Sequence, residues 1–380
     1  MAYLDNAATT QVSQMSKELV TGLMRYFANP SSLYPPAADN RGLIESSRGT
    51  IAEVLGTEKS NIIFTSGGSE SNALAIKGVA HQLKTSGKTH CITTCIEHTS
   101  VLGCFKQLEE DGFQVTYLSV GDDPHALVRK VNDAIRNDTG FVSVMYVNNE
   151  TGMILPIKQI GQLCKNKNIL FHTDCVQAFG QCPISLNPES KNYIPCNMMS
   201  VSGHKLHAPK GVGFLYSDIE NLEPLIPGHQ EFGLRGGTEN IPYIVAMGLE
   251  ARSAAAKSAV STKRSQALYD FFKTLLAKKY KHKYTINCEN VPHSSKIISL
   301  TLPGLHAESL ILYLASKEIY VSAGSACRSH EQKPSYVLTD LGLTEAQAQQ
   351  TIRISTSLFT SLDDMAKLVD ALCIAHKLLN

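Results

Sequence analysis

The sequence lacks the features that mark membrane, secreted and nucleic-acid-binding proteins. No apolar run approaches the length of a membrane span, and the first residues contain no basic segment followed by an apolar run. The net charge is only +1, which argues against a broad surface for nucleic acid or membrane. Internal repeats and low-complexity segments are also missing. We therefore expect a cytoplasmic protein with no membrane partner and no direct contact with nucleic acid.

The ten cysteines show no paired spacing that would indicate a disulfide framework. In a chain of 380 residues we expect them to be reduced thiols, most of them small core residues. One alternative is a metal cluster of Cys91, Cys95 and His98 in a structural or binding protein. Cys91 and Cys95 would share one face of a strand, but His98 lies past its end and no fourth ligand is evident. We therefore predict no metal site.

Strand-like apolar runs alternate with helical patterns through the first 240 residues. These runs cover Ile62–Thr65, Cys91–Ile96, Val115–Val120, Phe141–Val147, Ile169–His172 and Val212–Tyr216. The alternation predicts an α/β fold with a mostly parallel sheet that is covered on both faces. Beyond about residue 240 the pattern indicates a smaller α+β domain. We predict a large domain over residues 15–245, and a small domain made of residues 1–14 together with 246–380.

Polar clusters follow four of the predicted strands. They are Ser66–Ser69, Glu97-His98, Asn148–Glu150 and Thr173–Gln177. Each alone is more typical of a turn, a helix cap or a loop. Ligands of parallel sheets, however, bind beyond the carboxyl ends of the strands, and a small-residue turn before a helix is suited to a phosphate. The four clusters together predict a binding site at this edge of the sheet.

Lys205 stands among small and polar residues, directly after Ser202-Gly203-His204. A lysine amine becomes a nucleophile when its pKa is lowered, and its commonest catalytic use is Schiff-base formation with a carbonyl group. A surface turn is the alternative. The setting favours a site for an aldehyde cofactor.

Taken together, these segments resemble the pyridoxal-phosphate (PLP) cysteine desulfurases of the nitrogen-fixation and iron–sulfur-assembly type, within the class V aminotransferases. The resemblance covers nearly the whole chain. It is carried by segments that include Asn148–Glu150, 202–205, 235–240, 325–327 and 334–338. It implies PLP fold type I with a seven-stranded-type sheet, and a homodimer. The implied reaction converts L-cysteine to L-alanine and leaves a persulfide on Cys327 for a sulfur-acceptor protein.

The resemblance also implies a role for each matching residue. Lys205 would bind PLP and move the Cα proton, His98 would stack on the ring and transfer protons, and Cys327 would take up the sulfur. Asp174 would pair with the pyridine nitrogen. The other implied contacts are Asn148 and Gln177 near the ring hydroxyl, Gly68, Ser69, Ser202 and His204 at the phosphate, Thr238 reaching the phosphate from a second subunit, and Arg353 with Asn148 at the substrate.

The position of Cys327 shortly before Pro334–Leu338 is similar to that in the group with a long cysteine loop. Three departures from the family pattern, Tyr34, Phe232 and Ser357-Leu358, put the iron–sulfur role in doubt. Sulfur delivery to nucleic-acid thiolation or to DNA phosphorothioation is then an open pathway. A selenocysteine lyase or an aminotransferase of the same fold is the alternative activity, and a scaffold that serves a bound partner is a further one.

Overall fold

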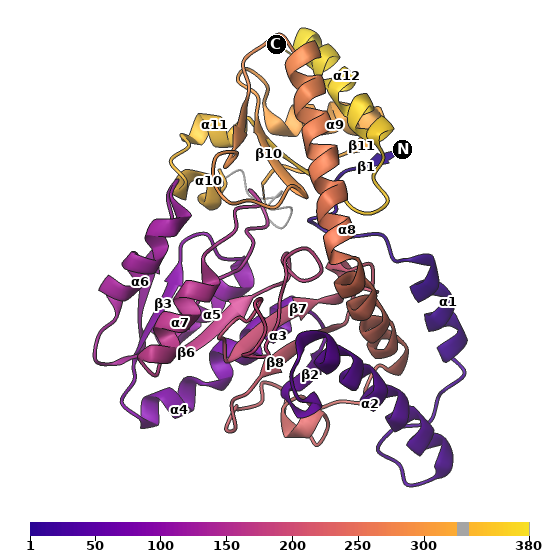
Figure 1. Cartoon of the computed structure of the whole chain (residues 1–380), viewed down its shortest axis with the longest axis vertical. Helices are drawn as coiled ribbons and strands as arrows, with labels where there is room; N and C mark the ends of the chain where they lie inside the picture. The colour runs from indigo at the N-terminus through magenta and orange to yellow at the C-terminus, as the bar shows by residue number, and fades with distance from the viewer. Residues whose placement is uncertain (325–333, 380) are drawn as a thin grey trace.

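A seven-stranded sheet and a three-stranded sheet organise the molecule (Figure 1). The computed structural model describes residues 1–324 and 334–379. Both termini lie beside the smaller sheet. No helix in these ranges is both long and apolar enough to cross a membrane.

The larger sheet has the strand order β2-β8-β7-β6-β5-β3-β4. Only β8 runs antiparallel to its neighbours, so the predicted mostly parallel sheet is confirmed. Its strands are β2 (Ile62–Thr65), β3 (His90–Thr94), β4 (Gln114–Leu118), β5 (Thr139–Ser143), β6 (Leu170–Asp174), β7 (Met198–Ser202) and β8 (Gly213–Ser217).

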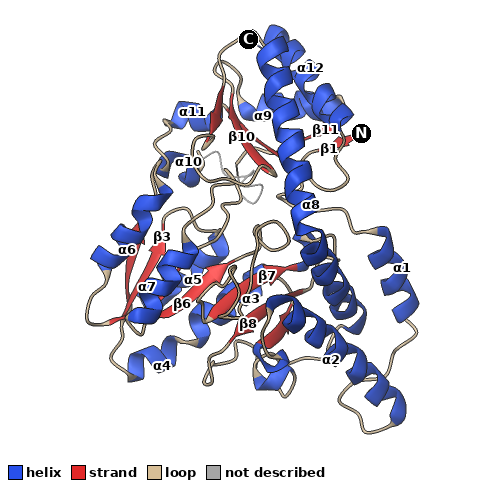
Figure 2. Ribbon diagram, in the orientation of Figure 1, coloured by secondary structure: helices blue, strands red, loops and turns tan. Residues whose placement is uncertain are grey.

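Helices cover both faces of this sheet, as Figure 2 shows. Neighbouring residues of one strand therefore enter different cores: Ile62 and Phe64 pack into one hydrophobic cluster, and Ile63 packs into another. Burial on both faces explains why the strands are continuous apolar runs. The helices of this part are α1 (Gln14–Leu23), α2 (Pro35–Leu55), α3 (Gly68–Gly78), α4 (Ala80–Thr85), α5 (Thr99–Glu110), α6 (Leu127–Ala134) and α7 (Ile157–Asn166), with short 3-10 turns η1 (Lys59–Asn61), η2 (Pro124–Ala126), η3 (Gly203–Lys205) and η4 (Glu231–Gly233).

The smaller sheet has the order β12-β10-β9 and is antiparallel. Beside it the N-terminal β1 pairs in parallel with β11. The elements of this part are β1 (Ala2–Tyr3), β9 (Thr285–Asn287), β10 (Ile297–Thr301), β11 (Ile319–Tyr320), β12 (Thr351–Ser355), α9 (Ala307–Ser316), α10 (Tyr336–Asp340), α11 (Glu345–Gln349) and α12 (Leu362–Leu379).

A single helix, α8 (Ile241–Lys279), connects the two sheets. Its first half packs Ile244 and Met247 into a core of the large sheet. Its second half packs Leu268 and Phe272 into the core of the small sheet. Because one helix belongs to both cores, the domain boundary near residue 245 stays a prediction.

Two local expectations differ from the structure. The helical pattern of the sequence predicts one helix from Glu70 to Leu83, but the structure has two, since α3 ends at Gly78 and α4 begins at Ala80. A Cβ at Gly78 would lie 2.7 Å from Leu222 Cδ1, so close packing against Leu222 requires glycine here. The segment Tyr34-Pro35-Pro36 predicts a turn, but its two prolines begin α2, at positions where no backbone N–H is needed.

Candidate active site

The polar clusters predicted at the strand ends meet around one cavity. Its volume is ≈ 230 Å³, and the N-terminal arm and β12 close it from the side of the small sheet. The predicted site residues that line it are Gly68, Ser69, His98, Asp174, Gln177, Ser202, His204, Lys205 and Arg353. The lining also includes Ala7, Ala8, Asn72, Ser100 and Asn149.

Lys205 reaches the cavity from η3, the 3-10 turn that directly follows β7. Its Nζ donates hydrogen bonds to the carbonyl oxygens of Ala7 at 2.5 Å and Ala8 at 2.7 Å. The backbone of Thr10 also donates to the His204 carbonyl at 2.9 Å. The N-terminal arm therefore fixes the lysine amine, although about 200 residues separate the two segments.

A chain of hydrogen bonds connects Asp174 with His98. Asn72 Nδ2 donates to Asp174 Oδ2 at 2.8 Å and to the Ser100 hydroxyl at 3.0 Å. That hydroxyl lies 2.8 Å from His98 Nδ1. Asp174 Oδ1 accepts from the Val176 backbone at 2.9 Å. Asn72 and Ser100 thus orient both predicted cofactor contacts, although neither residue was predicted from the sequence to have a role.

The hydrogen bonds of His98 define its tautomer. The residue caps the start of α5, where the Ser100 backbone N–H donates to Nδ1 at 3.2 Å. A backbone N–H can only donate, so Nδ1 accepts and the neutral ring carries its proton on Nε2. Burial lowers the pKa of His98, Asp174 opposes this shift, and the Lys205 amine adds to it. His98 is therefore neutral near pH 7.

The end of the cavity formed by Gly68 and Ser69 suits a phosphate. The two residues begin α3, where backbone N–H groups and the helix dipole favour an anion. A Cβ at Gly68 would lie 2.7 Å from Val176 Cγ2 and 3.4 Å from Ser202 Cβ, so glycine allows the close approach of these segments. His204 also lines the cavity, and burial lowers its pKa to about 3.

Three polar atoms in the cavity wall have no hydrogen-bond partner among the described residues: Asn72 Oδ1, Gln177 Oε1 and Arg353 Nε. The amide nitrogen of Gln177 donates to the Ala7 carbonyl at 2.9 Å. The Arg353 guanidinium donates from Nη1 to the Asn149 carbonyl at 2.9 Å, and from Nη2 to Asp5 at 2.9 Å and Ser322 at 2.7 Å. Two acceptors and a cationic donor therefore remain available to a bound molecule.

Two of the predicted site residues that the structure describes, Asn148 and Thr238, do not line the cavity. Asn148 is fully buried, and its side-chain oxygen accepts from the Glu150 and Thr151 backbones at 2.9 and 3.0 Å. Asn148 thus stabilises the turn that places Asn149 in the cavity wall. A direct contact of Asn148 with cofactor or substrate stays a prediction. Thr238 is exposed outside the cavity. Cys327 lies outside the described residues.

The alternative metal cluster is not formed. Among residues 1–324 and 334–379 no group of three or more His, Cys, Asp and Glu side chains could hold a metal ion. Burial raises the pKa of Cys91 to about 12 and that of Cys95 to about 11, so both remain thiols. The nine described cysteines are free and none is exposed, which agrees with their expected role as small core residues.

Comparison with known proteins identifies the family. The model of the aminotransferase class-V family matches residues 2–368. The chain belongs to this family. It is 38% identical over 371 residues to cysteine desulfurase 2 of Trichormus variabilis, covering 97% of this chain and 91% of the relative.

Solved structures of similar proteins show the same fold. A NifS-like protein matches with a TM-score of 0.90 and 30% identity, over 100% of both chains. SspA in complex with cysteine matches with a TM-score of 0.81 and 34% identity, over 95% of this chain and 100% of the other. The predicted resemblance and PLP fold type I are thereby confirmed, and the family is one of PLP-dependent enzymes.

Proposed function

We propose that this chain is a PLP-dependent cysteine desulfurase that converts L-cysteine to L-alanine and transfers the sulfur to Cys327 as a persulfide. The observation that carries the proposal is the convergence of Lys205, Asp174, His98 and Arg353 on one cavity in a chain that is 38% identical to a cysteine desulfurase. The complex of SspA with cysteine supports cysteine as the substrate.

The residues present fit PLP. The start of α3 with Gly68, Ser69 and Ser202 would hold the phosphate, and Lys205 would bind the aldehyde carbon. Asp174, held by Asn72 and the Val176 backbone, would accept a hydrogen bond from the protonated ring nitrogen. The unpartnered Gln177 Oε1 would accept one from the ring hydroxyl. When bound, PLP supplies an electron sink for the bonds at the Cα atom of the substrate.

The chain's own side chains would bind the substrate and move its protons. Arg353 would bind the carboxylate, because its guanidinium already stands in the cavity wall with Nε unpartnered in the described structure. The Lys205 amine would take the proton from Cα. His98, with its proton on Nε2, would exchange protons at the substrate.

The sulfur step follows from thiolate chemistry. The Cys327 thiolate would attack the substrate sulfur and form an S–S bond while the bond between that sulfur and Cβ breaks. The electron pair released to Cβ would be protonated, which gives the methyl group of alanine. No external oxidant is needed, because the substrate carbon is reduced while the sulfur is oxidised.

The direct test is incubation of the PLP-loaded protein with L-cysteine and a thiol reductant, followed by measurement of sulfide and alanine. We expect the two products in equal amounts. A selenocysteine lyase would release selenide from L-selenocysteine but no sulfide from L-cysteine. An aminotransferase would form a keto acid with an acceptor substrate. Either result in place of sulfide and alanine would contradict the proposal.

Replacing Arg353 with lysine should weaken substrate binding. Lysine keeps the charge but loses the planar fork that binds a carboxylate through two donors. Charge-assisted hydrogen bonds contribute about 1.5–3 kcal/mol, so we expect KM for L-cysteine to rise roughly 10- to 100-fold, measured by initial rates of alanine formation. Arg252→Lys is the matched control, because the contacts of Arg252 with Glu53 and Thr50 are exposed and lie outside the cavity. An unchanged KM in Arg353→Lys would assign the carboxylate to another residue.

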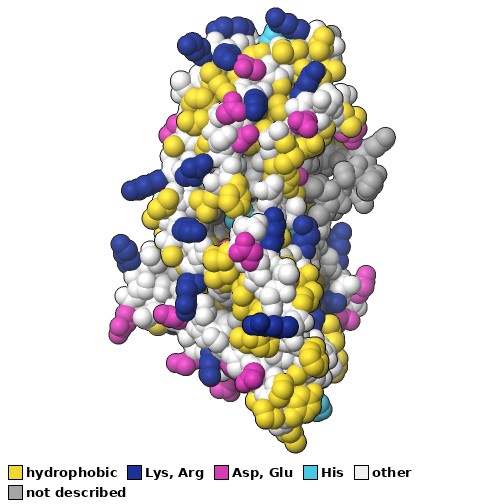
Figure 3. All heavy atoms as spheres, turned by 90° about the vertical axis from the view of Figure 1, so that its right-hand side faces the viewer, with side chains coloured by type: hydrophobic (Ala, Val, Ile, Leu, Met, Phe, Trp, Pro, Cys, Tyr) yellow, Lys and Arg dark blue, Asp and Glu magenta, His cyan; other side chains and the backbone are white. Residues whose placement is uncertain are grey.

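A homodimer would complete the site. Thr238 is exposed outside the cavity of its own chain, so a contact with the phosphate would require the second subunit. Hydrophobic side chains gather at the lower end of the face in Figure 3. The loop between α1 and α2 exposes Met24, Phe27 and Leu33 to 67%, 95% and 99%, more than an isolated chain would be expected to leave in water.

The sulfur acceptor would be a second protein, in iron–sulfur assembly, nucleic-acid thiolation or DNA phosphorothioation. Of the three departures from the family pattern, Tyr34 and Phe232 are 51% and 56% exposed, where they could change partner choice. The third, Ser357-Leu358, lies in the wall of a second cavity.

A further inference from the structure

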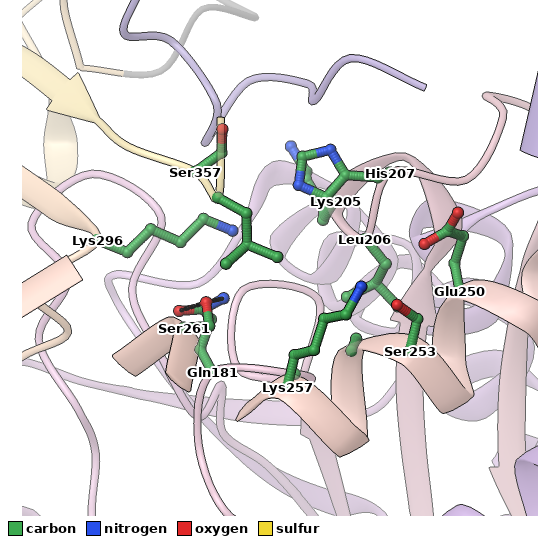
Figure 4. Close-up of a pocket in the computed structure, with 13 residues that line it drawn as sticks. Gln181, Lys205, Leu206, His207, Glu250, Ser253, Lys257, Ser261, Lys296 and Ser357 are labelled. Atoms are coloured by element: carbon green, nitrogen blue, oxygen red, sulfur yellow. Dashed lines mark hydrogen bonds between the residues drawn. The ribbon is translucent and has the colours of Figure 1, made fainter. Parts of the chain in front are cut away.

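A second cavity, which shares Lys205 with the active-site cavity, lies between α8 and the start of β10 (Figure 4). Its volume is ≈ 40 Å³, which is room for roughly three water molecules at 10–15 Å³ each. The residues that define its chemistry are Lys257, Lys296, Ser253, His207 and Glu250. Among the described residues that line this cavity, only Lys205 also lines the active-site cavity, and its amine donates to the Ala7 and Ala8 carbonyls.

Lys296 is the unusual member of this cavity. It is only 5% exposed, and its side chain extends into the cavity from the start of β10. Within the described part of the chain its amine has no hydrogen bond and no ion pair. Burial alone, with no neighbouring charge acting against it, lowers the pKa of this amine to about 8. An unpaired buried ammonium is unfavourable, so a counter-ion in the cavity would stabilise the protein.

The other donors face the same space. Lys257 projects into the cavity from α8, and Ser253 stands one turn earlier on the same helix. The Ser253 hydroxyl has no partner among the described residues. Glu250 supplies the one carboxylate among the described residues of the wall, and it lies on the opposite side from Lys296. Its Oε1 accepts hydrogen bonds from the hydroxyls of Ser13 and Ser16, so part of its charge is already compensated.

We propose that Lys296, Lys257 and Ser253 form a binding site for a small tetrahedral oxyanion of the sulfate or phosphate class. Two ammonium groups and a hydroxyl supply charge and donors from two elements, and lysine is a common binder of such anions. The bound oxyanion would bridge α8 and Lys296, the residue directly before β10. Helix α8 itself packs in both hydrophobic cores. The inference does not depend on the proposed desulfurase activity.

The site should be pH-dependent. The titratable groups that face Lys296 are Lys257 and Glu250 of α8, and Lys205 and His207 of the loop beyond β7. Burial lowers the pKa of His207, so this ring is neutral and does not add charge near pH 7. Oxyanion binding requires protonated Lys296. The affinity for the oxyanion should therefore be constant below pH 8. Above pH 8 it should fall by up to tenfold for each pH unit.

The test is equilibrium dialysis with radiolabelled sulfate on PLP-saturated protein, so that the phosphate end of the active-site cavity is filled. We expect one sulfate per chain, displaced by inorganic phosphate but not by chloride at equal ionic strength. Lys257→Met and Lys296→Met should each weaken binding at least about tenfold. Lys263→Met is the matched control on α8, since Lys263 is exposed and outside the cavity, and it should bind as the original protein does.

Thermal unfolding gives a second measurement. Without oxyanion, Lys296→Met should have a higher Tm, by about 2 °C or more, because an unpaired buried charge is removed. The pKa of Lys296 is lower in the folded state than in the unfolded state. The destabilisation from its buried charge is therefore full below pH 8 and disappears as the pH rises toward the pKa of the unfolded state. The Tm difference between the variant and the original protein should shrink over the same pH range. Added sulfate should raise the Tm of the original protein and not that of the variant. No sulfate bound at saturating PLP, or equal binding by Lys257→Met and Lys263→Met, would overturn the proposal.

Discussion

Replacing Lys205 with alanine is expected to abolish alanine formation from L-cysteine, with a loss of at least about 10³-fold. The variant loses both the covalent bond to PLP and the group that moves the Cα proton, and a positioned acid–base group alone contributes about 10²–10⁴-fold. Lys205→Arg should be equally inactive, because a guanidinium keeps the charge but does not form this bond.

The covalent bond can be measured directly. Borohydride reduction of the PLP-loaded protein followed by peptide mapping should place the pyridoxyl label on Lys205. Lys210→Ala is the control, because Lys210 is exposed and does not line the cavity, and it should keep full activity and the label. A label on any other lysine would contradict the assignment of the site.

Replacing Cys327 with alanine is the second large effect. The variant should keep the visible absorbance of bound PLP but lose the protein persulfide, and desulfuration should fall by about 10³-fold or more, as for other nucleophiles. The reason is that no other thiol is suited to the role among the residues the structure describes, since the nine cysteines there are buried or half-buried. For Cys91, Cys95, Cys164, Cys182 and Cys288, burial raises the thiol pKa to about 11 or 12.

Mass spectrometry of the protein after exposure to L-cysteine measures the persulfide. It should appear on the peptide that contains residue 327 and be absent from Cys327→Ala. Cys95→Ala is the control, because Cys95 is the cysteine nearest in sequence to His98, and it should form the persulfide normally. Sulfur transfer by Cys327→Ala at the original rate would exclude the proposed sulfur step and favour another activity of the class-V fold.

Much of the fold followed from local pattern. The strands β2, β3 and β6 lie within about two residues of the runs that predicted them, because strands buried on both faces are continuously apolar and bounded by turn residues. The interrupted helix after β2 was not predicted, because the contact between Gly78 and Leu222 joins residues far apart in the chain. Periodicity carries no information on such a contact.

The sequence by itself determined the α/β class, the edge of the sheet where polar clusters meet, and the lysine that stands there. All three follow from the order of residues along a strand and the turn after it. Only the tertiary structure decided that Asn72 and Ser100 connect Asp174 to His98, that Asn149 and not Asn148 lines the cavity, and that Lys296 is buried with no partner among residues 1–324 and 334–379. These are contacts between separate elements, and packing brings them together while sequence spacing does not.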